Sequence, residues 1–152
     1  MRWRVGDIQK YLEQKEYIDT VIIPLVPISW RQDLIASVRE GEFIDTIIRE
    51  TERQLQGRLV LTPPFTYLKT ESETDKLERL RAFESEFKGE NIKCVFFVTA
   101  DVGWKKNEND LKGLIWVAPI PLEHMDERYR KDFVDENVGL IMRHITEMWR
   151  KS

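Results

Sequence analysis

The stretch EYIDTVIIPLVPISW, residues 16–30, is central to the fold prediction. Its first octamer returns almost unchanged as EFIDTIIR at residues 42–49, so the residues that flank each copy must determine whether it forms a strand or a helix. Pro24 and Pro27 follow the first copy and cannot donate backbone hydrogen bonds, so a helix would break there. The β-branched residues that begin at Thr20 favour a buried strand instead. We therefore predict a strand from Thr20 to Leu25.

The second copy of the octamer has different flanking residues. It runs into ETERQLQG, where Leu55 continues an apolar face and Gly57 suits the end of a helix. We predict a helix from Glu42 to Gln56. Because the flanks of the two copies share nothing, the octamer is not a repeat of supersecondary size. We expect Ile22 and Ile47 to be buried in two different kinds of element.

Two further helices are expected before the second octamer. Asp7 is placed to cap a short helix, and Ser29 with Gln32 has capping-box spacing at the start of another. Gly41 is expected to bend or divide this later helix. Its first turns have an apolar face that is predicted to point inward, formed by Leu34, Ile35 and Val38.

The remaining chain alternates strands and helices. A strand is predicted at 58–64, a helix at 73–89, two apolar strands at 92–100 and 113–119, and a last helix from Glu127 to Trp149. The connection DVGWKKNENDLK between the two apolar strands is polar and short for a helical crossover, so we predict a β-hairpin there. Its tip, Lys105 to Lys112, is expected to be mobile and dispensable for folding.

This order of elements is typical of the α/β class. We predict a three-layer αβα sandwich with a mostly parallel four-stranded sheet and a β-hairpin at strands three and four. The continuous apolar strands favour a sheet that is buried on both faces. Since no segment resembles an interdomain linker, residues 1–152 are expected to form a single α/β domain.

Composition argues against several classes of function. The 152 residues are 41% hydrophobic and 34% charged, and 24 Lys and Arg against 27 Asp and Glu give a formal charge of −3. This balance does not attract phosphate backbones, so no nucleic-acid partner is expected. Prolines interrupt the longest apolar run, so no membrane insertion is expected. Cys94 lies in an apolar run and indicates a buried, inert thiol in a reducing cytoplasm.

A site is expected beyond the carboxyl ends of the parallel strands, where ligands bind in open α/β sheets. The loops PLVPISWR, TPPFTY and TADVGW are rich in aromatic residues. Two interpretations remain open: the rings cover the sheet end or contact a partner chain, or they line a pocket for a flat or apolar small molecule. The candidate residues are Ser29, Trp30, Arg31, Phe65, Tyr67, Asp101 and Trp104, with Thr62 and Thr99 beside them.

Catalytic and cofactor signatures are absent from the sequence. Neither GxGxxG nor GxxxxGK[ST] occurs, so no phosphate cradle and no cofactor is expected. His124 and His144 have no partner at metal-ligand spacing, so we expect no metal site. Ser29 lacks the glycines of a nucleophile elbow. Asp101 follows a parallel strand and is a candidate acid without an assigned role.

The N-terminal sequence MRWRVGDIQKYLEQKEYIDTVIIPLVPISW, residues 1–30, resembles the ypiF-like family of uncharacterised proteins from Bacillus and related bacteria. The resemblance extends over essentially the whole chain and rests on similarity of sequence, not on a chemical motif. The family is a domain of unknown function. The resemblance therefore implies a bacterial cytoplasmic protein and provides no catalytic residue.

Two hypotheses of function follow. The first is a non-catalytic cytosolic α/β protein that binds a protein partner, or a second copy of itself, through its aromatic strand-end loops and its chain ends, MRWRVGD and EMWRKS. The alternative is a small-molecule-binding protein or enzyme that uses Trp30, Asp101 and Trp104 at the carboxyl ends of the strands. The sequence contains no signature that identifies a substrate.

Overall fold

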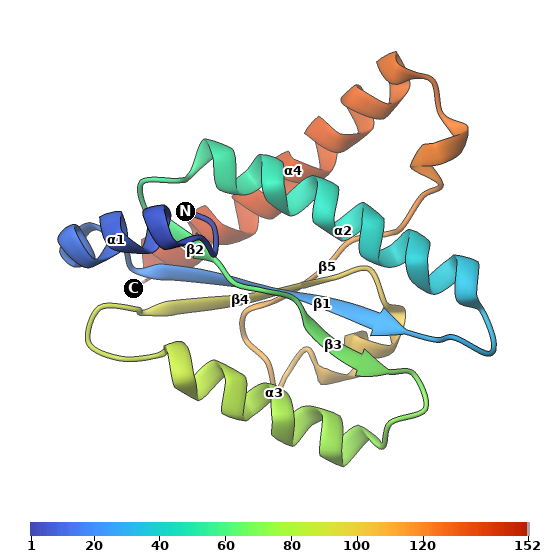
Figure 1. Cartoon of the computed structure of the whole chain (residues 1–152), viewed down its shortest axis with the longest axis horizontal. Coiled ribbons are helices and arrows are strands. Elements are labelled where there is room, and N and C mark those ends of the chain that lie inside the picture. The colour runs from blue at the N-terminus through green and yellow to red at the C-terminus, as the bar shows by residue number, and fades with distance from the viewer. Residues whose placement is uncertain (152) are drawn as a thin grey trace.

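The computed structural model describes residues 1–151 and has a parallel sheet at its centre (Figure 1). Strand β1 pairs on one side with β2 and β3 and on the other with β4, and β5 extends the sheet beyond β4. All of these pairings are parallel. The strands are β1 Thr20–Ile28, β2 Leu59–Leu61, β3 Phe65–Leu68, β4 Cys94–Thr99 and β5 Leu114–Trp116.

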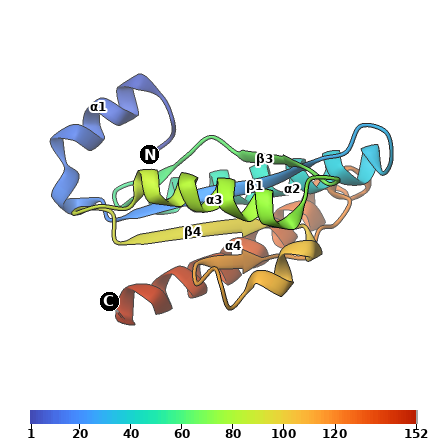
Figure 2. The ribbon, with the colours of Figure 1, turned by 90° about the horizontal axis from the view of Figure 1, so that it is seen from below.

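Helices cover both faces of this sheet (Figures 1 and 2). Helices α2 and α4 pack on one face, while α3 packs on the other, where α1 adds Ile8 and Tyr11. The predicted α/β class with a mostly parallel sheet is confirmed. The helices are α1 Val5–Glu13, α2 Leu34–Gln54, α3 Glu73–Phe87 and α4 Glu127–Lys151, with short 3₁₀-helices η1 Lys15–Tyr17, η2 Val102–Asn107 and η3 Leu122–His124.

The sheet has five strands where four were predicted, because its edge is interrupted. Strands β2 and β3 both pair with β1, and Thr62, Pro63 and Pro64 separate them. A proline cannot donate to a β-ladder, so the run predicted at 58–64 stops pairing at Leu61 and pairing resumes at Phe65. The two short strands together occupy one edge position.

The predicted β-hairpin is wrong, because β4 and β5 are parallel. The connection between them is a compact crossover that contains η2 and is anchored by two buried side chains, Trp104 and Leu111. Arg81 of α3 also donates a hydrogen bond to the carbonyl of Asp110 at 3.3 Å. The segment predicted as a mobile tip is therefore packed against the body, since Trp104 and Leu111 offset the cost of ordering its polar residues.

Glycine permits the close approach that this crossover needs. A β-carbon added to Gly113 would lie 2.0 Å from the carbonyl oxygen of Val95 in β4, a contact between backbone atoms that no rotamer change relieves. Gly113 also accepts a hydrogen bond from the amide of Phe97 at 2.9 Å. The return of the chain into β5 thus depends on the absence of a side chain at Gly113.

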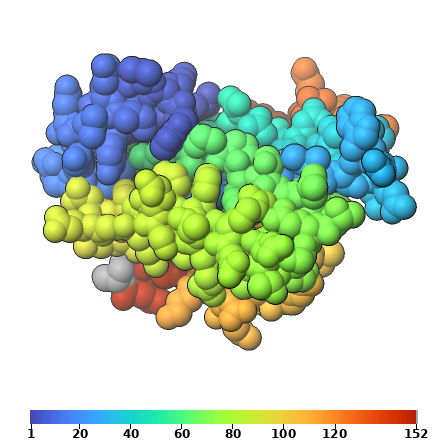
Figure 3. All heavy atoms as spheres, turned by 60° about the horizontal axis from the view of Figure 1, so that its bottom comes forward, coloured from blue at the N-terminus to red at the C-terminus, as the bar shows by residue number. Residues whose placement is uncertain are grey.

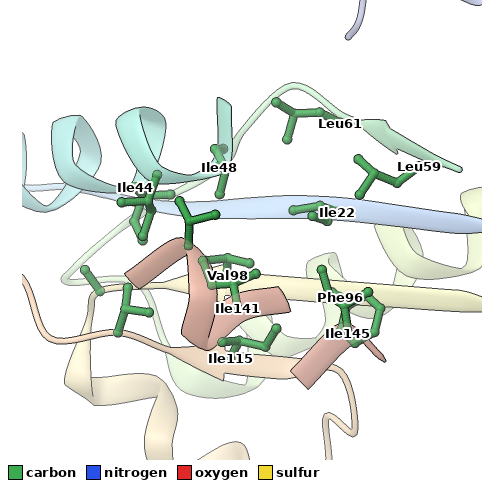
Figure 4. Close-up of a cluster of buried hydrophobic side chains, with 14 of the residues drawn as sticks. Ile22, Ile44, Ile48, Leu59, Leu61, Phe96, Val98, Ile115, Ile141 and Ile145 are labelled. Carbon is green, nitrogen blue, oxygen red and sulfur yellow. The ribbon is translucent and has the colours of Figure 1, made fainter. Parts of the chain in front are cut away.

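The two copies of the octamer adopt different structures, as predicted. Ile22 lies in β1 and Ile47 in α2, and both are fully buried. Figure 4 shows Ile22 on β1 in the core that the sheet forms with α2 and α4, and Ile44 and Ile48 of the second copy belong to the same cluster. The flanking residues, and not the octamer itself, determine the element. Cys94 is buried in the same core, as predicted.

Helix α2 differs from its prediction in three respects. It is continuous through Gly41, whose missing side chain lets the helix approach β1: an added β-carbon would lie 3.0 Å from Cγ1 of Val26. Ser29 does not cap it, because the Ser29 hydroxyl donates to the carbonyl of Gln32 and the helix begins only at Leu34. The apolar residues predicted to point inward are exposed: Leu34, Ile35 and Val38.

Leu34, Ile35 and Val38 are exposed because a different face of α2 packs on the sheet. Ser37 is the buried residue of the first turns, and its hydroxyl donates to the carbonyl of Leu34 at 2.9 Å. Ser37 lies on the same face as Ile44 and Ile48, which face the sheet. The early apolar residues therefore lie off the face that packs on the sheet. At α1, Asp7 is likewise not a cap but accepts a hydrogen bond from the amide of Arg2 at 2.7 Å.

Candidate functional site

The carboxyl ends of β1, β3 and β4 lie together, but the predicted site residues point to two faces of the sheet. Phe65 and Tyr67 alternate with Thr66 and Leu68 along β3, so both rings point toward α3. Trp104 joins them in the core on that face. Phe65, Tyr67 and Trp104 are all buried, whereas Ser29, Trp30 and Arg31 lie in the loop after β1, with Trp30 78% exposed.

The buried residues form a hydrogen-bonded group. The indole nitrogen of Trp104 donates to the hydroxyl of Tyr67 at 2.8 Å, and this hydroxyl donates to Oδ2 of Asp101 at 2.7 Å. The amide of Gly103 donates to Oδ1 of Asp101 at 2.9 Å. Burial, then the hydrogen bond to Asp101, raises the pKa of Tyr67. Tyr67 is therefore a fixed donor, and Asp101 is the acceptor that orients it.

A buried lysine completes this group. Lys76 of α3 has a side chain only 9% exposed, and its ammonium lies 4.4 Å from the ring centre of Trp104 and 5.1 Å from that of Tyr67. Both distances suit cation–π attraction. Glu73 is its ion-pair partner at 4.0 Å. We call Tyr67, Lys76, Asp101 and Trp104 the Tyr67 cluster.

Sequence reasoning missed Lys76. The sequence pattern that could have identified it is its spacing of four residues to Leu80 and seven to Phe83, which places the lysine on the inward face of α3. The cluster joins three elements, β3, α3 and the crossover, through hydrogen bonds and ring contacts. Its polar groups are engaged with each other under α3, so the arrangement fastens the crossover to the sheet.

The exposed residues line an open groove on the α2 side of the strand ends. It has a volume of about 490 Å³ and is lined by Ile28 and Trp30 from the end of β1 and by Leu68 and Lys69 from the end of β3. Ile28 is paired with Leu68 in the sheet, so these side chains lie next to each other on one face. We call this the strand-end groove. Figure 3 shows the segment after β1, in light blue, at one end of the molecule.

An ion pair lies at the side of this groove. The ammonium of Lys69 is 3.7 Å from Oε1 of Glu40, whose side chain is 15% exposed. Oε2 of Glu40 is buried and accepts no hydrogen bond from the described residues. Burial raises the pKa of Glu40 and Asp101 adds to this effect, while Lys69 opposes it. Glu40 is thus a carboxyl group with an unused acceptor, and sequence reasoning did not identify it.

The tryptophans near the two chain ends, Trp3 and Trp149, differ in how closely they pack against the rest of the chain. Trp149 donates a hydrogen bond to the hydroxyl of Thr20 at 2.8 Å, and the guanidinium of Arg58 stacks 3.6 Å from its ring centre. Trp3 is half exposed and makes an edge contact with Phe87 at 6.0 Å. The C-terminal tryptophan therefore serves packing within the chain.

Residues 1–151 contain neither a cluster of metal ligands nor a helix that could span a membrane. This part of the chain has no group of three or more His, Cys, Asp or Glu side chains arranged to hold a metal ion. His124 and His144 are both exposed. None of its helices combines the length and the apolar character needed to span a bilayer.

Comparison with known proteins shows the family. The family described as "Protein of unknown function (DUF2487)" matches residues 9–149. The chain belongs to the DUF2487 family. It is also 34% identical over 149 residues to "Uncharacterized protein YpiF" of Bacillus subtilis (strain 168), which covers 98% of both chains. No solved structure matches it.

This membership bears out the resemblance of the N-terminal sequence to the ypiF-like proteins. Neither the DUF2487 description nor the name of the Bacillus relative states an activity. The matched range contains the strand-end groove and the Tyr67 cluster. These two sites are therefore the basis on which a function for this family member can be argued.

Proposed function

We propose that this DUF2487 protein is a non-catalytic, single-domain cytoplasmic protein that binds a protein partner in the strand-end groove. The observation that carries the proposal is the exposure of three large apolar side chains, Ile28, Trp30 and Leu68, around one hollow. Isolated exposed apolar residues are ordinary, but an apolar group that lines a groove marks an interaction site.

The energetics favour an apolar anchor from the partner. Burial of a large apolar side chain contributes about 1.5–3 kcal/mol relative to leaving it exposed, and Trp30 is 78% exposed in the free chain. Ile28 and Leu68 are held side by side by the β1–β3 ladder, so little order is lost when they are covered. Arg31, which lines the groove and is exposed, would attract an acidic residue beside that anchor.

The same geometry argues against catalysis at the strand ends. Asp101 was the candidate acid, and both of its carboxylate oxygens accept hydrogen bonds, from Tyr67 and from Gly103. Tyr67 and Trp104 are buried. The groups capable of acid–base chemistry thus hold the crossover in place. The groove, in contrast, presents mainly apolar surface for a partner to contact.

Photocrosslinking in cells tests the proposal. Trp30 is replaced by p-benzoylphenylalanine, with the same replacement at Leu12, an exposed apolar residue of α1 at the other end of the molecule, as the matched control. We expect a discrete adduct with one protein from position 30 and not from position 12, and we expect Leu68→Asp to reduce it at least tenfold. An adduct pattern shared by both positions would refute a specific groove.

A small molecule is the second candidate occupant of the groove. The groove volume of about 490 Å³ lies within the range of ligand sites, and the exposed ring of Trp30 among its lining residues offers a flat apolar surface. Under this alternative, a panel of flat, apolar compounds would raise the melting temperature of the wild type but not of Trp30→Ala. Quenching of Trp30 fluorescence by the same compounds would place them in the groove.

A further inference from the structure

We propose that a second copy of this chain pairs with the free edge of β5, in an antiparallel, two-fold symmetric contact that joins the two sheets into one. Strand β5 is the last strand of the sheet, on the side away from β2 and β3 (Figure 2). The contact uses no residue of the strand-end groove, so it goes beyond the proposed function.

The backbone groups of β5 point alternately toward β4 and away from it. The amide of Phe97 donates to the carbonyl of Gly113 at 2.9 Å, and the amide of Val117 donates to the carbonyl of Thr99 at 2.9 Å. Gly113, Ile115 and Val117 therefore face β4, while the residues between them face outward. Four outward groups have no hydrogen-bond partner within residues 1–151: the carbonyls of Leu114 and Trp116 and the amides of Trp116 and Ala118.

These four groups are complementary to themselves under a two-fold axis at Trp116. In an antiparallel pair, outward-facing residues exchange hydrogen bonds with the residues opposite them. The axis sets Trp116 against Trp116 of the second copy, and each amide donates to the other carbonyl. It also sets Ala118 against Leu114, so each Ala118 amide meets a free Leu114 carbonyl. The amide of Leu114 needs no partner, because it already donates to the carbonyl of Leu111 at 3.1 Å.

The side chains at this edge fit the same register. Residues opposite each other in an antiparallel pair lie on one face of the sheet, so the two partly exposed Trp116 rings become neighbours. Each Leu114 lies opposite Ala118, which sets a large side chain against a small, exposed one. Pro119 follows and cannot donate, so the ladder ends after Ala118. The contact is therefore a short ladder centred on Trp116.

The surroundings of β5 favour a second copy over a peptide from another protein. When a peptide adds a strand to a sheet edge, pockets beside that edge give the specificity for its side chains. Five surface hollows of this molecule, the strand-end groove among them, are lined entirely by residues outside 105–119. The recognition at β5 thus depends on hydrogen-bond register, which an identical strand supplies in full.

Pairing through β5 also limits the assembly to two copies. The contact is isologous, since the same edge is used by both chains. The β2–β3 edges then lie at the two outer sides of the joined sheet, where Pro63 and Pro64 cannot donate to a further strand. The two-fold pairing is therefore closed.

Sedimentation velocity over a wide range of concentration tests the contact. We expect the wild type to dimerise and Ala118→Pro to raise the dissociation constant at least tenfold, because the contact loses the Ala118 amide twice. Ala118→Ser is the matched control, since it keeps the amide and should dimerise like the wild type. The side chain of Ala118 is exposed and its amide has no partner within residues 1–151, so both variants should fold, which circular dichroism checks.

Cysteine crosslinking tests the register. Trp116 lies on the axis, where the Cα atoms of a hydrogen-bonded antiparallel pair are about 5.5 Å apart, within the range of a disulfide. Mild oxidation should link Trp116→Cys into a covalent dimer. Ala118→Cys is the matched control, because its two copies lie about 13 Å apart and should not link. A mixture of Ala118→Cys and Leu114→Cys should link, and it keeps Trp116 intact in both chains.

Two results would overturn the inference. One is a wild type that stays monomeric at every concentration, whether or not it binds an added extended peptide. The other is a linkage of Ala118→Cys alone that is as fast as that of the mixture. The crosslink at position 30 would still report on the strand-end groove in a monomeric chain, so the two proposals fail separately.

Discussion

At the scale of single residues, the Tyr67 hydroxyl contributes most to the hydrogen bonding of its cluster. It accepts from Trp104 and donates to Asp101, so its removal leaves the buried indole N–H of Trp104 and Oδ2 of the partly buried Asp101 without this partner. We expect Tyr67→Phe to lower the free energy of unfolding by about 1–3 kcal/mol. Urea denaturation measures this loss. Tyr129→Phe is the matched control, since Tyr129 is exposed and should change stability by less than about 0.5 kcal/mol.

Glu40 gives a prediction of pH dependence. Its pKa in the folded chain is raised by burial above the ordinary value of 4.5, so the folded state holds the proton more tightly than the unfolded state. Ionisation of Glu40 therefore opposes folding. As the pH rises through and above 4.5, the wild type should lose stability relative to Glu40→Gln. Denaturation of both proteins across the acidic range checks this; a constant difference would contradict it.

At the scale of elements, the return of the crossover into β5 depends on Gly113. A methyl group there meets the Val95 carbonyl, so Gly113→Ala must displace β4 or β5. We expect a loss of about 1–3 kcal/mol in the free energy of unfolding. Gly139→Ala is the control, and it should raise the free energy of unfolding instead of lowering it. No atom lies within 4 Å of its added β-carbon, and alanine is favoured over glycine inside a helix such as α4 by about 1 kcal/mol.

The octamer gives a second prediction at this scale. Ile22→Ala in β1 and Ile47→Ala in α2 both remove fully buried side chains, so each should lower the free energy of unfolding by about 2–5 kcal/mol. Calorimetry or chemical denaturation of the two variants measures this. Ile35→Ala is the matched control within α2, because Ile35 is exposed in the free chain and its truncation leaves no cavity. Equal losses at Ile35 and Ile47 would contradict the observed phase of the helix.

The elements also show what sequence reasoning can reach. Prolines and β-branched residues separated the two copies of the octamer correctly, because these effects are local. The hairpin was mispredicted because the crossover is mostly polar and was therefore expected to be solvated. The burial of its two apolar residues, Trp104 and Leu111, depends on contacts with α3 and β3, which are distant in the sequence. The phase of α2 was mispredicted because Ser37, a polar residue, occupies the inward position where an apolar one was expected.

At the scale of the whole molecule, the α/β class and the parallel sheet follow from the sequence, whereas the site does not. Strand alternation turns Tyr67 toward α3, and the end of β1 carries Trp30 to the surface, so residues adjacent in the predicted loops separate across the sheet. The spacing within α3 places Lys76 on the inward face, but its contact with Trp104 and the ion pair of Glu40 with Lys69 arise only in the tertiary structure. Distances between such residues are not encoded in any local pattern.

The interrupted edge formed by β2 and β3 has a consequence for solubility. Pro63 and Pro64 present no amide hydrogens, the amide of Leu61 is already bonded to the carbonyl of Met1, and Arg79 occupies the carbonyl of Thr66. A neighbouring molecule thus finds no continuous row of donors and acceptors on which to add a strand. Replacing Pro63 and Pro64 by Val and Thr should speed fibril growth in agitated solution, followed by thioflavin fluorescence. The two prolines would then be residues that prevent edge-to-edge strand addition and amyloid formation.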